Sequence, residues 1–312
     1  MAQNSNPFWG PPPSYDASQT TGHGGDPPPY HNWQDAVPDT SVFPPPPVSG
    51  YYFSGTGNAR PEDAEQAHVF CNETPLWLPV KPSPAVYSTV QHHDLRPVRQ
   101  RQYRGDLVPT GPGRWSGRTS DQNGDCLVLT HLPLYFAAAD SPFLRETRAT
   151  IYFEVTLRRL GPGPGAVDDS GFAIGFVAQP YPAWRSPGWE RGSVGVFSDD
   201  GCRFVNDSWG GREFTSGFQI GETVGLGMIL SRPEGASAKG EKKTRTCDVE
   251  IFFTRNGQRV GGWDLHEETD EEAGGVEGLE GEHDLYGAIG LFGGVQFEAC
   301  FDPAGWLWRP RE

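Results

Sequence analysis

The sequence lacks most of the features that metal binding, disulfide bonding, secretion or membrane insertion require. Its 312 residues include only five cysteines, at positions 71, 126, 202, 247 and 300. They form no CxxC pair and no metal-ligand spacing, which excludes a recognisable zinc site or disulfide framework. No apolar run approaches the roughly 18 residues of a membrane-spanning helix, so we expect no membrane span. No N-terminal hydrophobic segment indicates secretion, which favours a cytoplasmic protein with free thiols.

Catalytic motifs are missing as well. The chain contains no GxSxG, HExxH or phosphate-binding GxxxxGK pattern. Asp168-Asp169 and Asp199-Asp200 are adjacent pairs in glycine-bounded turns, where aspartates usually form the turn rather than a general acid and base. His92-His93 has only Asp94 beside it, in a proline-rich stretch, which favours a surface loop over a metal site. We therefore expect a non-enzymatic protein with no catalytic residues, no metal and no cofactor.

Proline, glycine and negative charge are abundant instead. The 30 prolines and 41 glycines, against 36% hydrophobic residues, predict one folded core plus unstructured segments. The net charge of −15 argues against nucleic acid or an anionic membrane as the main partner. Much of that charge lies in the acidic loop 266–284, which holds nine carboxylates and no lysine or arginine. Such a run indicates a solvated loop between strands.

Residues 1–65 are expected to be a disordered, proline-rich tail. Twelve of the first fifty residues are proline, which favours polyproline II and disfavours helices and sheet ladders. The tail has too few aliphatic residues to offset the entropy of ordering it. Phe43 and the four prolines after it resemble the core recognised by EVH-type domains, but no acidic flank or repeat supports that interpretation, and a stiff spacer is favoured.

Two PPxY motifs stand out within this tail. Consecutive prolines pre-form the left-handed helix that lies across the aromatic groove of a WW domain, and the tyrosine fills a second pocket. About 20 Å of flexible chain joins the motifs, so two WW domains of one partner could be engaged together. The alternative is that the PPxY pattern occurs by chance in a proline-rich tail. The presence of two copies argues against that alternative. The predicted WW-binding residues are Pro12, Pro13, Tyr15, Pro27, Pro28 and Tyr30.

Between the tail and the main domain, residues 66–125 are expected to form an extension that packs on the domain. Proline and acidic residues from Pro61 onward predict the start of a helix. The apolar residues 76–79 are expected to dock on the domain. The basic stretch 81–122 is expected to be loop-like.

From residue 126 to 308 the pattern predicts an antiparallel β-sandwich. Short apolar runs at regular spacing alternate with turn signals, and there is almost no helix signal. Arg255 to Gln258 predicts a hairpin, because Asn-Gly is the strongest two-residue turn signal. The expected strands are 126–130, 151–157, 171–177, 193–197, 223–230, 247–254, 285–292 and 295–301.

Four ordered blocks within this region resemble SPRY domains. The first is SPGWERGSVGVFSDDG at 186–201; residues 214–225, 251–257 and 285–291 continue the pattern. It is most similar to the Ran-binding-protein-like and fungal endosomal-adaptor subgroup. The resemblance implies a concanavalin-like jelly-roll sandwich. Ser186 stands where the family usually has leucine, so no ligand preference is carried over.

The resemblance and the tail together imply an adaptor. The tail would recruit a HECT-type ubiquitin ligase through its WW domains. The SPRY domain would bind a protein cargo, such as a transporter tail, and promote its ubiquitination and its endosomal or vacuolar sorting. Fungal adaptors of this kind usually carry a transmembrane helix before the domain, and none is visible here.

Two other functions compete with the adaptor. One is a Ran-binding-protein-like scaffold subunit of a multi-subunit ligase, which usually carries helical LisH and CTLH-type segments after the SPRY domain. The other is a carbohydrate-binding or hydrolytic sandwich, which would need convergent carboxylates.

The partner-binding surface of the SPRY domain is predicted at loops on one end of the sandwich. Aromatic and arginine side chains, which dominate interface hot spots, concentrate in the loop after residue 178. Trp189 in the same loop is expected to be a core residue. The predicted partner-binding residues are Tyr181, Trp184, Arg185, Arg191, Asp199, Asp200, Trp209 and Arg212.

Overall fold

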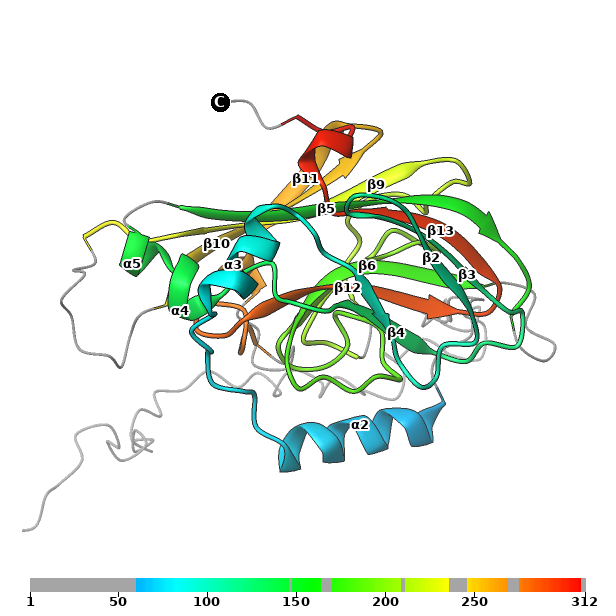
Figure 1. The fold of residues 1–312 in the computed structure, drawn as a ribbon. Coiled ribbons are helices and arrows are strands. Elements are labelled where there is room, and N and C mark those ends of the chain that lie inside the picture. The colour runs from blue at the N-terminus through cyan, green and yellow to red at the C-terminus, as the bar shows by residue number, and fades with distance from the viewer. Residues whose placement is uncertain are drawn as a thin grey trace, which may run out of the picture. The chain divides into compact units, whose positions relative to one another are not determined.

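The computed structural model describes residues 60–145, 148–163, 170–208, 211–235, 246–268 and 275–309. Two antiparallel sheets lie face to face, one above the other in Figure 1. The predicted all-β antiparallel sandwich is confirmed. Both PPxY motifs and Trp209 lie outside the described residues.

The first sheet has six strands in the order β1-β4-β12-β6-β7-β8. Its strands are β1 Pro97–Arg99, β4 Cys126–Thr130, β6 Gly171–Ala178, β7 Ser193–Phe197, β8 Arg203–Val205 and β12 Leu285–Phe292.

The second sheet has seven strands in the order β11-β10-β9-β5-β13-β3-β2. Its strands are β2 Gly105–Gly111, β3 Arg114–Thr119, β5 Ala149–Leu160, β9 Thr223–Ser231, β10 Asp248–Arg255, β11 Gln258–Asp264 and β13 Val295–Cys300. Asn256 and Gly257 turn β10 into β11 with φ of 48° and 79°, as the predicted Asn-Gly hairpin requires.

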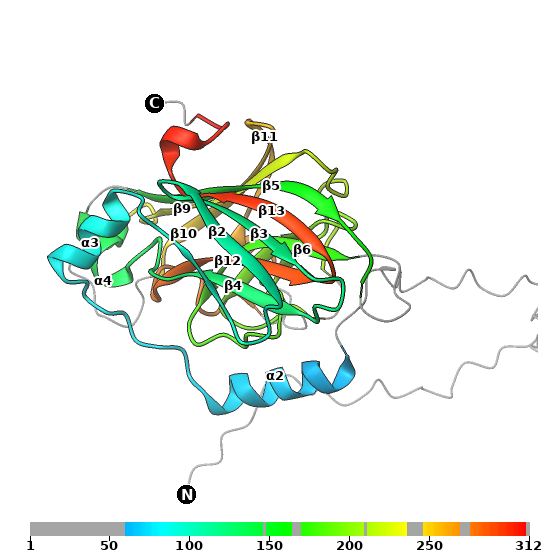
Figure 2. The ribbon, with the colours of Figure 1, turned by 45° about the vertical axis from the view of Figure 1, so that its right-hand side comes forward.

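Helices lie outside the two sheets. They are α2 Pro61–Glu73, α3 Pro84–Gln91, α4 Ala137–Asp140 and α5 Pro142–Arg145, with 3-10 turns η3 Leu265–Glu268 and η4 Pro303–Gly305. Helix α2 runs along the six-stranded side of the sandwich in both views (Figures 1 and 2). No helix in the described part of the chain is long and apolar enough to cross a membrane.

The main core fills the space between the sheets. Phe153 of β5 meets Phe176 of β6 edge-on, with ring centroids 5.6 Å apart. Phe172 of β6 and Phe297 of β13 make a second cross-sheet aromatic contact at 6.5 Å. All four rings are buried. Aromatic pairs of this kind add specific geometry to the area that the rings bury.

The six-stranded sheet is covered on its outer face too. All five residues of β4 are buried, so this strand does not alternate between core and solvent. A second apolar cluster lies on that face and consists of Leu127, Leu129, Val177, Tyr181 and Ala288. Tyr181 comes from the segment 179–192 that joins β6 to β7. We name this segment the β6–β7 loop.

Glycines in three neighbouring strands allow the β6–β7 loop to lie close to this sheet. A methyl group on Gly175 would meet Pro187 Cβ at 2.6 Å, and one on Gly290 would meet Pro187 Cδ at 2.9 Å. At Gly195 it would collide with the carbonyl oxygen of Pro187. A glycine inside a strand often marks such a close backbone approach. The backbone that approaches these glycines is that of the β6–β7 loop.

Three expectations need correction. The stretch 81–122 is not loop-like, because it contains α3 and strands β1, β2 and β3. These strands belong to the sheets although they precede residue 126, the expected start of the sandwich. Residues 61–65 are not part of a disordered tail, because they form the first turns of α2.

The acidic loop 266–284 is only partly as expected. Within its described residues, Leu279 is fully buried, and the carbonyl of Glu277 accepts a 3.0 Å hydrogen bond from Gly192 N. This part of the acidic segment therefore packs on the β6–β7 loop instead of standing free in solvent.

The contact between Pro187 and the glycines predicts a large cost for a small substitution. Gly195→Ala should lower the free energy of unfolding by about 2 kcal/mol or more, because its methyl group would force the loop off the sheet. Gly171→Ala is the matched control in β6, since its methyl group would make an ordinary 3.7 Å contact with Phe292. Urea unfolding of both variants checks this, and equal effects would contradict it.

Candidate partner-binding surface

The β6–β7 loop is held in one shape by hydrogen bonds around two hydroxyl groups. Tyr181 Oη donates to the carbonyl of Ser186 at 2.6 Å and accepts from Glu190 N at 3.2 Å. Ser193 Oγ accepts from Gly188 N at 2.8 Å and donates to the carbonyl of Glu190 at 2.5 Å. The loop is therefore a rigid platform although it contains no regular secondary structure.

A buried ion pair lies inside this platform. Arg185 Nε donates to Glu190 Oε1 at 2.7 Å, and both side chains are 3% exposed. The guanidinium of Arg185 also stacks over the ring of Trp189, 4.4 Å from its centroid. Burial raises the pKa of Glu190, whereas Arg185 opposes this shift. Removing either partner would leave an uncompensated buried charge, which is strongly destabilising.

Helix α2 lies directly on the β6–β7 loop (Figures 1 and 2). Trp184 Nε1 donates to the main-chain carbonyl of Asp63, in the first turn of the helix, at 3.0 Å. The ring of Trp184 also meets Phe70 edge-on, with centroids 5.9 Å apart. Pro61 at the first position and the acidic residues Glu62 and Asp63 suit the start of a helix.

Arg191 fixes the other end of α2. Its Nε donates to the carbonyl of Cys71 at 3.1 Å, and its Nη2 donates to the carbonyl of Thr74. The last turn of α2 has no basic residue of its own. The loop therefore supplies the cation that the unpaired carbonyls and the negative end of the helix dipole favour.

His68 makes a third link between the helix and the loop region. Its Nε2 lies 3.6 Å from Glu190 Oε2 and 3.3 Å from Ser208 Oγ. The imidazole faces the buried ion pair from the helix side, so Glu190 touches both Arg185 and α2.

The structure corrects the predicted exposure of two residues. Tyr181 and Arg185 are 5% and 2% exposed, so they organise the platform and do not face solvent. Trp189 is half-buried and stacks on Phe197, outside the main core. Trp184 and Arg191 are also half-buried, because both contact α2.

The remaining predicted residues lie elsewhere. The exposed Asp199 and Asp200 form the turn after β7, and exposed Arg212 pairs through its backbone with Arg203 at the start of β8. Strand β7 separates this turn from the β6–β7 loop by about 16 Å, at 3.3 Å per residue. The predicted set thus falls into two groups, with Trp209 outside the described residues.

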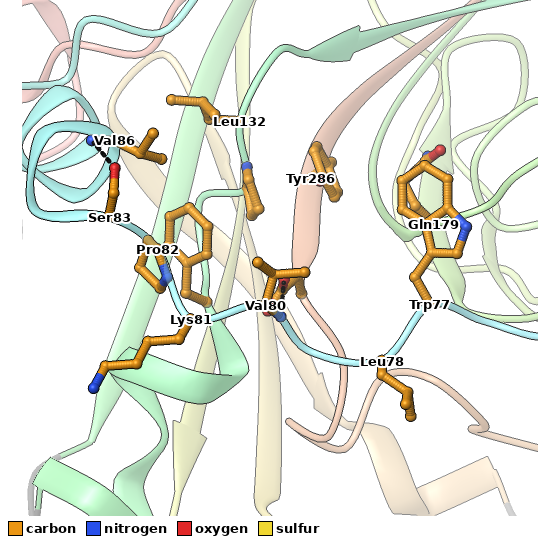
Figure 3. Close-up of a pocket in the computed structure, with 13 residues that line it drawn as sticks. Trp77, Leu78, Val80, Lys81, Pro82, Ser83, Val86, Leu132, Gln179 and Tyr286 are labelled. Atoms are coloured by element: carbon orange, nitrogen blue, oxygen red, sulfur yellow. Dashed lines mark hydrogen bonds between the residues drawn. The ribbon is translucent and has the colours of Figure 1, made fainter.

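An apolar groove continues from the end of α2, and the sequence did not reveal it. Trp77 and Leu78 are 59% and 82% exposed, although residues 76–79 were expected to dock. Only Leu76 packs on the core, while Trp77 is held through its backbone by Gln179 and His283. Figure 3 shows Trp77 beside Gln179, with Leu78 pointing away from the other labelled residues.

The groove encloses about 290 Å³ and its walls are mainly apolar. Tyr286 of β12 and Val80 line it. Asp284 also lines it, but its carboxylate accepts hydrogen bonds from Val80 N and Ala137 N, so it is already engaged. No group of three potential metal ligands gathers here or anywhere else in the described ranges.

Asp125 makes the stability of the folded chain depend on pH. Burial raises its pKa from 3.8 to about 7, Arg185 opposes the shift, and Asp63 of α2 adds to it. The unfolded chain loses this proton near pH 3.8, whereas the folded chain keeps it until about pH 7. Folding therefore carries a penalty that is absent at low pH and grows as the pH rises to about 7.

Asp125→Asn should remove that penalty. The difference in the free energy of unfolding between the variant and the native chain should be about 1–2 kcal/mol larger at pH 8 than at pH 5, after allowance for partial solvent screening. Urea unfolding of both proteins at the two pH values measures this difference. An equal difference at pH 5 and pH 8 would show that Asp125 does not titrate as described.

Comparisons with known proteins add a family resemblance. No family model matches the chain. It is 31% identical over 137 residues to a SPRY domain-containing protein of Schizosaccharomyces pombe, covering 44% of this chain and 27% of that protein. It is 33% identical over 119 residues to SPRY domain-containing protein 3 of Homo sapiens, covering 37% and 22%. Protein ssh4 of Sclerotinia sclerotiorum is 28% identical over 135 residues, with coverages of 43% and 20%.

Among solved structures, the chain is similar to a human SPRY domain with 22% identity and a TM-score of 0.40, covering 63% of this chain and 95% of that one. The chain spans about a quarter or less of the length of the curated relatives that it matches. The similarity in sequence therefore concerns one module of those proteins. The described sandwich is SPRY-like: its sequence resembles SPRY domain-containing proteins, and its two antiparallel sheets are the fold that this resemblance implies.

Proposed function

We propose that this protein is a non-enzymatic adaptor that links a WW-domain ubiquitin ligase of the HECT type to a protein cargo. Its tail recruits the ligase through Tyr15 and Tyr30, and its SPRY-like sandwich binds the cargo. The outcome is ubiquitination of the cargo and its sorting at endosomal or vacuolar membranes. The repeated PPxY motif, joined to a SPRY-like domain, is the observation that carries this proposal.

Two contributions to ligase binding support the proposal. Each PPxY motif offers a preformed polyproline helix and a flat aromatic ring, which together match the two pockets of a WW domain. Linking two weak contacts by about 20 Å of flexible chain raises the effective concentration of the second to the millimolar range. Tandem WW domains should therefore bind far more tightly than single ones.

The β6–β7 loop supports the cargo-binding half of the proposal. Trp184 and Arg191 are residue types that carry much of the binding energy at protein interfaces. They project from a platform whose own hydrogen bonds fix its shape, so little conformational entropy is lost when a partner binds.

The ligase half can be tested by calorimetry on the full chain with a tandem WW protein. Tyr15→Ala combined with Tyr30→Ala should weaken binding by about a hundredfold or more, and each single variant should lose most of the avidity. Tyr51→Ala with Tyr52→Ala is the matched control, since it removes two tail tyrosines outside both motifs. Unchanged affinity of the Tyr15/Tyr30 variant would reject the proposal.

A further inference from the structure

The geometry points to α2 as a removable cover that occupies, within the same chain, a site for an α-helix of the cargo protein. This inference rests on the proposed function, because it specifies the partner class of the cargo-binding surface. The site is the part of the β6–β7 loop that contacts α2, with Trp184 and Arg191 at its two ends.

Helix α2 buries little apolar area against the β6–β7 loop. Of the 13 residues of α2, Ala67 alone is buried. The residues that are at least partly covered follow one helical face and are Asp63, Ala64, Ala67, Phe70 and Cys71. The opposite face is exposed and polar except for Val69. Because apolar area provides most of the stability of a docked helix, this one is attached weakly enough to leave.

The polar anchors recognise the backbone of a helix and not its sequence. Trp184 binds the carbonyl of Asp63, and Arg191 binds the carbonyls of Cys71 and Thr74. Any helix of similar length presents such carbonyls, and its C-terminal end attracts a cation through the helix dipole. These contacts therefore suit a helical ligand in general.

The surface beneath α2 does not depend on α2 for its shape. The hydrogen bonds of Tyr181 and Ser193 and the ion pair between Arg185 and Glu190 all lie within the platform. When α2 leaves, the platform keeps its shape and exposes Trp184 and Arg191. A preformed surface of this kind binds with a small entropic cost.

The contacts of α2 also define the preferred partner. A small residue is needed where Ala67 is fully buried, and an aromatic residue three positions later meets Trp184. A hydrogen-bond donor directly after the small residue would occupy the place of His68, facing Glu190. The partner is thus a helix with a small-donor-x-aromatic pattern that ends near Arg191.

Tethering makes α2 a competitor. An attached helix is present at a high effective concentration, so a partner helix must bind more tightly than α2 in order to displace it. Cargo helices that match the pattern poorly are thereby rejected.

The experiment supplies the helix as a separate peptide to the full chain. The probe is a fluorescently labelled peptide with the native sequence of residues 60–75, followed by anisotropy up to about 1 mM. The receptor is the full chain carrying Ala67→Glu and Phe70→Ala, which should undock its own α2 without altering the platform. We expect saturable binding at least about tenfold tighter than to the native chain, whose site is already filled.

Three matched comparisons make the result specific. A peptide that carries the same two substitutions should not bind. Adding Arg191→Gln to the undocked chain should weaken binding of the native peptide at least about threefold. The control Val69→Ala changes an exposed α2 residue. Its α2 should stay docked, so it should bind the peptide as weakly as the native chain does.

Urea unfolding and near-ultraviolet circular dichroism confirm that each variant is folded. A folded Ala67→Glu, Phe70→Ala chain that binds no native peptide would overturn the inference. If that variant fails to fold, α2 is a structural part of the sandwich, which also overturns it. Neither result affects ligase recruitment, because the WW test depends only on the tail.

Discussion

The close approach of Pro187 to the six-stranded sheet is the contact on which the candidate surface depends. It is possible only because β6, β7 and β12 each place a glycine beneath it, at Gly175, Gly195 and Gly290. A side chain at any of them would lift the β6–β7 loop. Once the loop is seated, Tyr181 fills the apolar cluster on the outer face and its hydroxyl group ties Ser186 to Glu190. Strands β4, β6 and β7 of this sheet are therefore buried on both faces, as their continuous apolar runs require.

This seating determines where the functional groups of the loop point. Arg185 and Glu190 turn inward and pair, while Trp184 and Arg191 turn outward and bind the two ends of α2. The chain beyond α2 then passes Gln179 and forms the wall of the apolar groove at Trp77. Helix, platform and groove thus make one continuous surface. This is the surface that the proposed adaptor would use to bind its cargo.

Much of the fold could be predicted from the sequence, because the inner strands carry their own signals. Strands β4, β7 and β12 begin and end where apolar runs meet turn residues. Strands β2 and β3 were missed because neither carries a repeating apolar face: β2 has no buried residue, and the two buried residues of β3 are Gly117 and Thr119. The burial of Tyr181 and Arg185 could not be predicted either, since it depends on Leu127 and Glu190, and tertiary contacts of this kind leave no periodic pattern. The PPxY interpretation still rests on the sequence alone.

The most direct test of this account is hydrogen exchange of the full chain followed by mass spectrometry. The account predicts that the β6–β7 loop, although it lacks regular structure, exchanges as slowly as the strands it covers, whereas α2 exchanges through more frequent local opening. That result would establish a rigid platform beneath a removable helix. Fast exchange throughout the loop, at the rate of α2 or above, would contradict the account, because the surface would then have no fixed shape.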